Sequence, residues 1–313
     1  MTKKICVIGN SVADFIASPV EKIPRWGELM DIVNPITMNI GGNGAISAAC
    51  AARLGLKPYL VSKIGSDELG TRLKSVLDTA KVNTQWLFSD AKTPTSVTLA
   101  IVNNEGERMF FHHIGSNAKL TIKDIKKIKL KGMNGLILGS MFILPGIKPK
   151  DAAAIVKMAK DNKLPTFLDV AWDPTGKWDI GNVFKNVDFF MPNEEELLHI
   201  ARTRSLTRAV ERLHKKGMDT IIVKQGASGC TVFDFGHRSM HIKAPRVKAV
   251  DSTGAGDAFN AGFIYSYLDS GDVRHSAEFA TFAASKTVTG IGGARAAPTI
   301  KEVNQFMKKH SKS

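Results

Sequence analysis

Short apolar runs alternate along the chain with longer stretches in which apolar residues recur every three or four positions. The short runs predict buried β-strands, and the longer stretches predict helices with one buried face. The predicted strands cover residues 5–10, 58–64, 135–139, 166–170, 187–191 and 220–224, and the predicted helices cover 45–54, 69–80, 151–162 and 207–216. Because strands and helices alternate, we expect an α/β fold whose mainly parallel sheet is covered by helices on both faces.

Two regions break this alternation. Residues 14–38 contain turn residues and short extended pieces without a long helical pattern, and in residues 93–113 two strand-like segments flank the polar turn 103–107. The second region therefore predicts a hairpin. We expect a single domain over residues 1–313, with these two regions forming a small β-sheet lid over a site. A decorative hairpin at the sheet edge is the alternative.

The stretch from Asp251 to Asp257 is rich in small residues, and an apolar helix pattern follows it at once. Unpaired N–H groups and the positive end of the helix dipole would make an anion site around Gly254, Ala255 and Gly256. Asp257 stands in the first helical turn, where a carboxylate could take a proton from a hydroxyl that attacks a bound phosphate. We expect the helix N-terminus to favour the ionised form of Asp257. A simple helix cap is the alternative interpretation.

Polar residues near the ends of predicted strands extend this candidate site. Asp14 lies just past the first strand, on the side where ligands bind in open α/β sheets, and could accept hydrogen bonds from substrate hydroxyls. A plain turn residue is the alternative for Asp14. The glycine-rich segment Gly41, Gly42, Asn43 and Gly44 precedes a predicted helix and matches neither a Walker loop nor a dinucleotide fingerprint.

Two further segments fit a nucleotide. Asn193 to Glu196 reads as a capping box, and its acid could also help to hold hydrated Mg²⁺. Lys224 offers a positive charge for phosphates, and Gly226 and Gly229 allow a nucleotide to lie against the backbone. His112 and His113 point to opposite faces of a strand and are not expected to bind one ion together.

Charge and cysteine content indicate which partners and which cellular location to expect for this protein. The formal net charge of +14 favours anionic partners, but the charge is spread along the chain, so we expect no nucleic-acid role. The densest basic run, residues 123–131, predicts a solvated helix face. Cys6, Cys50 and Cys230 lack metal-ligand spacing and predict reduced thiols. With no signal peptide or membrane span apparent, we expect a cytoplasmic protein.

Together these features resemble the ribokinase-like family of carbohydrate kinases, also called the phosphofructokinase B family. The resemblance runs from Val7 to about Pro298 and is most specific over residues 251–264. Further matching positions are Gly41-Gly42, Gly44, Ala48, Gly55, Gly65 to Gly70, Glu105 to Arg108 and Gly115 to Ala118. It implies a ribokinase-like three-layer sandwich with a β-sheet lid.

The resemblance also implies an ATP-dependent kinase that acts on a hydroxyl of a sugar-like substrate. Asp257 would be the base, and the amides of Gly254, Ala255 and Gly256 would form the anion hole. The matching positions for substrate are Asp14, Gly41, Gly42 and Asn43; for Mg²⁺ and phosphate they are Asn193 and Glu196; for the nucleotide they include Lys224, Gly226 and Gly229. Many members use K⁺ near this loop, and Asp251 and Thr253 occupy the corresponding positions.

Several departures from the family pattern bear on the substrate. Ile46 stands where members usually carry Asn, while Asn43 and Val12 replace a Lys and an Asn of ribokinases proper. Because an apolar side chain cannot hydrogen-bond a hydroxyl, these changes argue against ribose. Thr281 replaces an Asn that is common near the adenine. A nucleoside kinase and a non-catalytic sugar- or nucleotide-binding protein are the alternatives, and we expect a homodimer through the lid.

Overall fold

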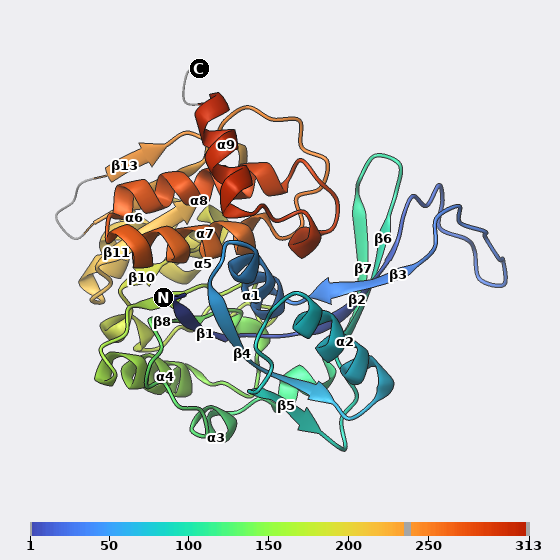
Figure 1. Cartoon of the computed structure of the whole chain (residues 1–313), viewed down its shortest axis with the longest axis horizontal. Helices are drawn as coiled ribbons and strands as arrows, with labels where there is room; N and C mark the ends of the chain where they lie inside the picture. Colours follow the sequence, from blue (N-terminus) through green and yellow to red (C-terminus); the bar gives the residue numbers. More distant parts are fainter. Residues whose placement is uncertain (1, 235–238, 311–313) are drawn as a thin grey trace.

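A nine-stranded sheet forms the centre of the computed structural model, which describes residues 2–234 and 239–310 (Figure 1). The strand order is β13-β12-β11-β10-β9-β8-β1-β4-β5. Neighbouring strands are parallel except where β12 pairs with β11 and with β13. The strands are β1 (Lys4–Ile8), β4 (Lys57–Gly65), β5 (Leu87–Asp90), β8 (Gly135–Leu138), β9 (Thr166–Leu168), β10 (Phe189–Phe190), β11 (Thr220–Lys224), β12 (Cys230–Phe233) and β13 (Ser239–Ile242).

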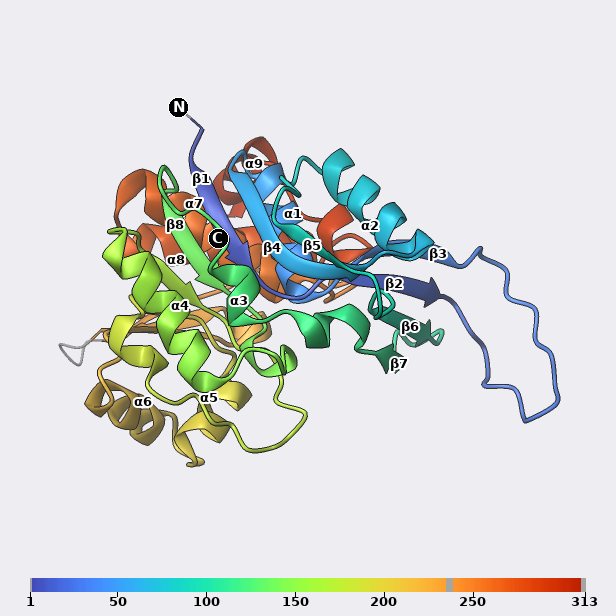
Figure 2. The same ribbon diagram turned by 90° about the horizontal axis from the view of Figure 1, so that it is seen from below.

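Helices cover both faces of this sheet, as Figure 2 shows from below. The helices are α1 (Asn43–Arg53), α2 (Glu68–Thr79), α3 (Ile122–Ile125), α4 (Pro149–Asp161), α5 (Glu194–Ala201), α6 (Leu206–Lys215), α7 (Ala255–Ser270), α8 (Val273–Thr287) and α9 (Ile300–His310). Alternate residues of β1 enter two separate apolar cores. Val7 belongs to the core shared with α1, α2, α7, α8 and α9, whereas Ile8 belongs to the core shared with α3 to α6. The predicted three-layer sandwich is confirmed.

The lid is a separate four-stranded sheet that projects from the body of the molecule (Figure 1). Its strands are β2 (Val12–Ala17), β3 (Thr37–Gly41), β6 (Val97–Val102) and β7 (Arg108–His113), in the order β3-β2-β6-β7. The hairpin predicted in residues 93–113 is formed by β6 and β7. The other lid region is mostly an extended loop between β2 and β3, and its strands reach beyond 14–38 at both ends.

Strand register assigns the lid residues to two faces. Asp14, Thr98 and His112 pair directly across β2, β6 and β7, so they share a face. Because side chains alternate along a strand, Phe110 and Arg108 lie on that same face. Met109, Phe111 and His113 lie on the opposite face. His112 and His113 therefore do point apart, as their adjacency predicted.

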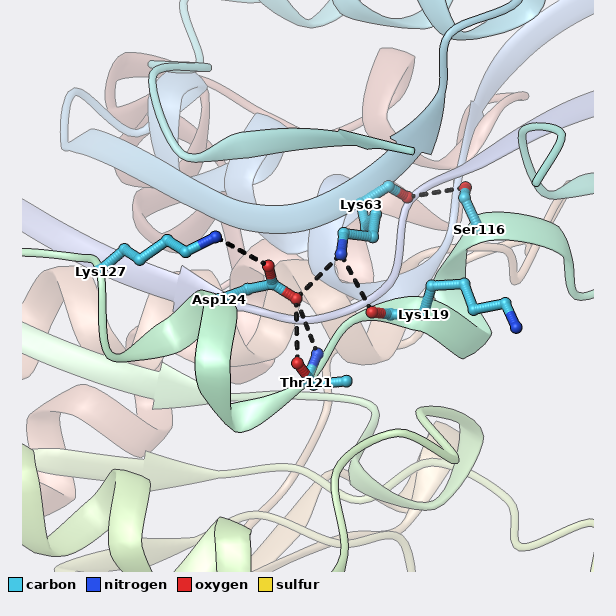
Figure 3. Close-up of polar contacts among 6 residues, drawn as sticks. All are labelled: Lys63, Ser116, Lys119, Thr121, Asp124 and Lys127. Atoms are coloured by element: carbon cyan, nitrogen blue, oxygen red, sulfur yellow. Dashed lines mark hydrogen bonds and ion pairs between the residues drawn. The ribbon is translucent and has the colours of Figure 1, made fainter. Parts of the chain in front are cut away.

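The prediction of a solvated helix over the basic run 123–131 is wrong in part, because α3 spans a single turn. The apolar residues of the run, Ile125, Ile128 and Leu130, are buried. Asp124, the acid within this run, is paired with Lys63 of β4 at 2.9 Å (Figure 3). This pair anchors the short turn to the sheet, so the segment is held by a tertiary contact that periodicity does not reveal.

The three cysteines are free, as predicted, and all three are buried. Within the described ranges, no helix is long and apolar enough to cross a membrane.

Candidate active site

The N-terminus of α7 lies among small residues that the close packing requires. Gly254, the N-cap, has φ +72°, and a Cβ on it would stand 2.9 Å from Gly293 Cα and 3.2 Å from Ile46 Cγ2. Ala255 N–H donates to Ser252 O at 3.3 Å. The N–H groups of Gly254, Gly256 and Asp257 have no partner among the residues that the structure describes. These three amides, rather than the predicted set that included Ala255, are available to an anion.

Asp257 is buried at this helix end, with 5 % of its surface exposed. Its Oδ1 accepts a hydrogen bond from Ser47 Oγ of α1 at 2.7 Å. Burial raises the pKa of Asp257 to about 8, nearby Asp169 adds to the rise, and the Ser47 hydrogen bond and Lys224 oppose it. The expectation that the helix N-terminus keeps this carboxyl ionised is therefore not met, because desolvation outweighs the dipole. A pKa near the working pH suits a general base.

Asp169, which the sequence reading missed, lies just past β9 and pairs with Lys224 Nζ at 3.3 Å. Its other oxygen accepts from Asn260 Nδ2 of α7 at 2.6 Å. Lys224 ends β11, and a Cβ on Gly256 would lie 3.6 Å from its Nζ, so its ammonium borders the anion-binding loop. Asp169 follows a buried parallel strand, and it lies with Lys224 at the carboxyl ends of the strands, where ligands bind in open α/β sheets. This position in the sequence could have identified Asp169 as a candidate site residue.

Asn193 and Glu196 form the predicted capping box of α5. Asn193 Oδ1 accepts from Glu196 N at 2.8 Å, and Glu196 Oε2 accepts from Asn193 N at 2.9 Å. Glu196 is buried, and burial together with Asp169 raises its pKa despite the opposing charge of Lys224. Glu196 therefore caps α5 and also belongs to a charged cluster with Asp169, Lys224 and Asp257.

A mostly apolar cavity of about 590 Å³ opens beside this cluster. Its lining includes Lys224, Gly226, Gly229, Ser252, Ala255, Gly256, Phe259, Thr281 and Val288. The cavity therefore connects the anion-binding loop with the glycines that the sequence assigned to a nucleotide. Thr281 Oγ1 donates to Ala277 O at 2.8 Å within its own helix.

The predicted substrate residues gather where the lid meets α1. Asp14 packs so closely on Gly41 that a Cβ there would lie 2.0 Å from Asp14 Cγ. Gly42 is the N-cap of α1 and Asn43 its first residue, four positions before Ser47. Burial raises the pKa of Asp14 to about 6, opposed by a hydrogen bond from Thr98. Asp14 Oδ1 is buried and has no partner within the described part of the chain.

Asp251 and Thr253 sit in the loop before α7 and both contact Arg108 of the lid. Asp251 Oδ1 also accepts from Thr253 N at 2.7 Å, and Oδ2 accepts from Gly292 N at 2.9 Å. Although burial opposes ionisation, hydrogen bonds from Thr253, Gly292 and Arg108 hold the pKa of Asp251 below its ordinary value. The side-chain oxygens of both nominated K⁺ residues thus accept from N–H donors.

Comparison with known proteins matches residues 2–300 to the family model described as pfkB family carbohydrate kinase. A deoxyribokinase of Salmonella typhi is 28 % identical over 97 % of this chain and 98 % of its own length. The structure of an Arabidopsis thaliana ribokinase with ribose and ATP is similar with a TM-score of 0.84 and 25 % identity, covering 98 % and 99 % of the two chains. A putative ribokinase II of E. coli with ATP and Mg²⁺ shares the fold with a TM-score of 0.83 at 21 % identity, covering 99 % of this chain and all of that one.

Proposed function

Because this chain belongs to the pfkB family of carbohydrate kinases, we propose that it transfers the γ-phosphoryl group of ATP to a hydroxyl of a small sugar or sugar-like alcohol. The observation that carries this proposal is the junction at α7. There the buried Asp257 lies within one helical turn of three amides, its own included, that have no partner in the described part of the chain. A base and an anion site side by side are what in-line phosphoryl transfer requires.

In the proposed reaction, the sugar lies between the lid and α1, and its attacking hydroxyl faces Asp257. Asp257 takes the hydroxyl proton as the oxygen bonds to phosphorus, and ADP leaves. The amides of Gly254, Gly256 and Asp257 stabilise the charge on the transferred group. Asp14, whose buried Oδ1 has no partner among the described residues, accepts a hydrogen bond from another hydroxyl and fixes the orientation of the sugar.

ATP fits the cavity of about 590 Å³, with its phosphates directed toward Lys224 and the α7 N-terminus. The residues present also fit Mg²⁺. Asp169 and Glu196 offer carboxylate oxygens, and the buried Asn260 Oδ1 lacks a partner in the described ranges. Few protein ligands suit an ion that keeps waters and binds phosphate oxygens. Bound there with ATP, it would neutralise phosphate charge.

The pocket chemistry favours a substrate other than ribose. Ile46, 6 % exposed and packed against Gly254, presents an apolar side chain beside the anion-binding loop. On the site face of the lid, Phe110 is 59 % exposed and offers an aromatic surface. That ring suits the apolar face of a sugar and also the base of a nucleoside, which keeps nucleosides as the second candidate class.

The test is an ADP-release assay over a panel of sugars, sugar phosphates and nucleosides with Mg²⁺, ATP and KCl present. We expect at least one sugar to stimulate release well above the rate with ATP alone. Release with nucleosides alone would assign the second class. No release with any compound, combined with sugar-dependent thermal stabilisation, would instead indicate a binding protein without turnover.

We also propose that a second copy of the chain covers the outer face of the lid. Met109 and Phe111 are 46 % and 59 % exposed on the face opposite Arg108 and Asp14, and the loop residues Trp26 and Leu29 are almost fully exposed. Such an apolar surface is typical of an interface. Sedimentation should show a dimer, and Phe111→Glu should weaken it. A monomer at every concentration would contradict this arrangement.

A further inference from the structure

Arg108, the first residue of β7, reaches from the lid to the loop that precedes α7. Its Nη1 donates to Thr253 Oγ1, and its Nη2 pairs with Asp251 Oδ1. The contact joins segments 143 residues apart, and the side chains of Arg108 and Asp251 are 25 % and 10 % exposed. A lid side chain therefore contacts the two residues that immediately precede the anion-binding amides.

Asp251 links two loops at this point. Its carboxylate holds the amides of Thr253 and Gly292, while Gly254 packs against Gly293 next to Gly292. Asp251 therefore helps to fix the positions of Gly254 and of the amides that follow it. Neutralising Asp251 from the lid stabilises this loop geometry.

The side chains that a monovalent metal ion would use at this position already have partners. Both carboxylate oxygens of Asp251 and the Thr253 hydroxyl accept from N–H donors, so an ion would have to displace the guanidinium or bind through backbone carbonyl oxygens alone. A guanidinium supplies the same charge in a fixed, forked geometry.

We propose that Arg108 is a positioning residue that takes the place of a monovalent cation beside the anion-binding loop, so that phosphoryl transfer needs no added K⁺. Because Arg108 belongs to the lid, this contact links the position of the lid to the geometry of the anion-binding loop. The inference rests on the proposed kinase function and specifies how the site is set up for it.

The experiment compares cations at constant ionic strength and constant Mg²⁺. The full chain is assayed with its best panel substrate in KCl, NaCl or tetramethylammonium chloride. We expect kcat of the wild type to agree within about twofold among the three salts. Arg108→Ala should lower kcat by about tenfold or more with a small change in the KM for ATP, and added guanidinium should restore part of the loss.

Two variants serve as controls. Arg108→Lys keeps the charge but loses the fork, so we expect intermediate kcat. Arg72→Ala removes the same charge from an exposed position on α2 and should behave as the wild type. As a readout independent of turnover, the melting temperature of the wild type should be the same in KCl and in tetramethylammonium chloride.

Tenfold or greater stimulation of the wild type by K⁺, an unchanged kcat in Arg108→Ala, or a specific stabilisation of the wild type by K⁺ would overturn the inference. Failure of the proposed function is distinguishable, since it would appear as absent turnover in every salt including KCl. In that case the melting temperatures still decide whether the loop binds K⁺.

Discussion

Two lysine–aspartate pairs lie near strand ends of the same sheet, and they differ in how completely their charges are satisfied. Asp124 pairs with Lys63 at 2.9 Å, accepts from Thr121 N and Oγ1 at 3.1 and 3.2 Å, and lies 3.6 Å from Lys127 (Figure 3). Lys63 also donates to Lys119 O at 3.1 Å. Although burial opposes ionisation, these contacts hold the pKa of Asp124 below its ordinary value.

The pair between Asp169 and Lys224 is longer, at 3.3 Å, and one ammonium there faces three carboxyls. Burial raises the pKa of both Glu196 and Asp257, and Asp169 adds to each rise. Asn260 Oδ1 beside Asp169 has no partner in the described chain. In the pair of Asp124 and Lys63 the charges are satisfied by contacts within the protein. Around Asp169 and Lys224, carboxyl groups and an amide oxygen are available to ligands. That difference supports the proposal that the second pair belongs to the active site.

The largest difference between the two pairs is expected when the lysine of each pair is replaced by methionine. Lys224→Met should lower kcat/KM for ATP by about 10²-fold or more, because phosphates lose a charge partner and three carboxyls lose their counter-ion. Steady-state kinetics and calorimetric ATP binding measure the effect. If ATP affinity and turnover stay close to those of the wild type, Lys224 does not bind the phosphates of ATP.

Lys63→Met is the matched change in the structural pair. It should lower the free energy of unfolding by about 2–3 kcal/mol, since a largely buried carboxylate loses its main partner. Urea denaturation gives the stability, and kcat/KM below the transition should stay within about twofold of the wild type. A loss of activity as large as that of Lys224→Met would erase the distinction between the two pairs.

Asp257→Asn should change how stability depends on pH. With a folded pKa of about 8 and an ordinary unfolded value, native Asp257 binds its proton over a range in which the unfolded chain has lost it. Stability of the wild type therefore falls as pH rises from about 4 to 8. The variant avoids this loss, so its stability relative to the wild type should be about 2–4 kcal/mol greater at pH 8 than at pH 4. A pH-independent difference would mean an ordinary pKa.

Ser47→Ala should have the smallest effect. Its hydroxyl lowers the pKa of Asp257, so its loss should move the alkaline rise of kcat/KM upward by about half a pH unit. Ser47→Thr keeps the hydroxyl and provides the matched control. If neither variant moves the pH profile, Ser47 does not position Asp257.

The sequence predicted six of the nine strands of the central sheet and the lid hairpin because their apolar periods are regular. It did not predict the outer strands β5, β12 and β13. It did not predict the length of α3, since Lys63 contacts Asp124 from a strand far along the chain. It located Asp257 from the small residues before α7 but misjudged its ionisation, because burial is a property of the packed fold. Asp169, Ser47 and Arg108 reach the site through packing between distant segments, so their contacts appear only in the structure.

The most direct test of the account compares the turnover of Asp257→Asn with that of the wild type on the best panel substrate, alongside ATP binding by each protein. Removal of the base should lower kcat by about 10²-fold or more while the dissociation constant for ATP stays within about threefold. A variant that turns over at nearly the native rate would show that Asp257 does not take the proton, and the proposed chemistry at the α7 N-terminus would be contradicted.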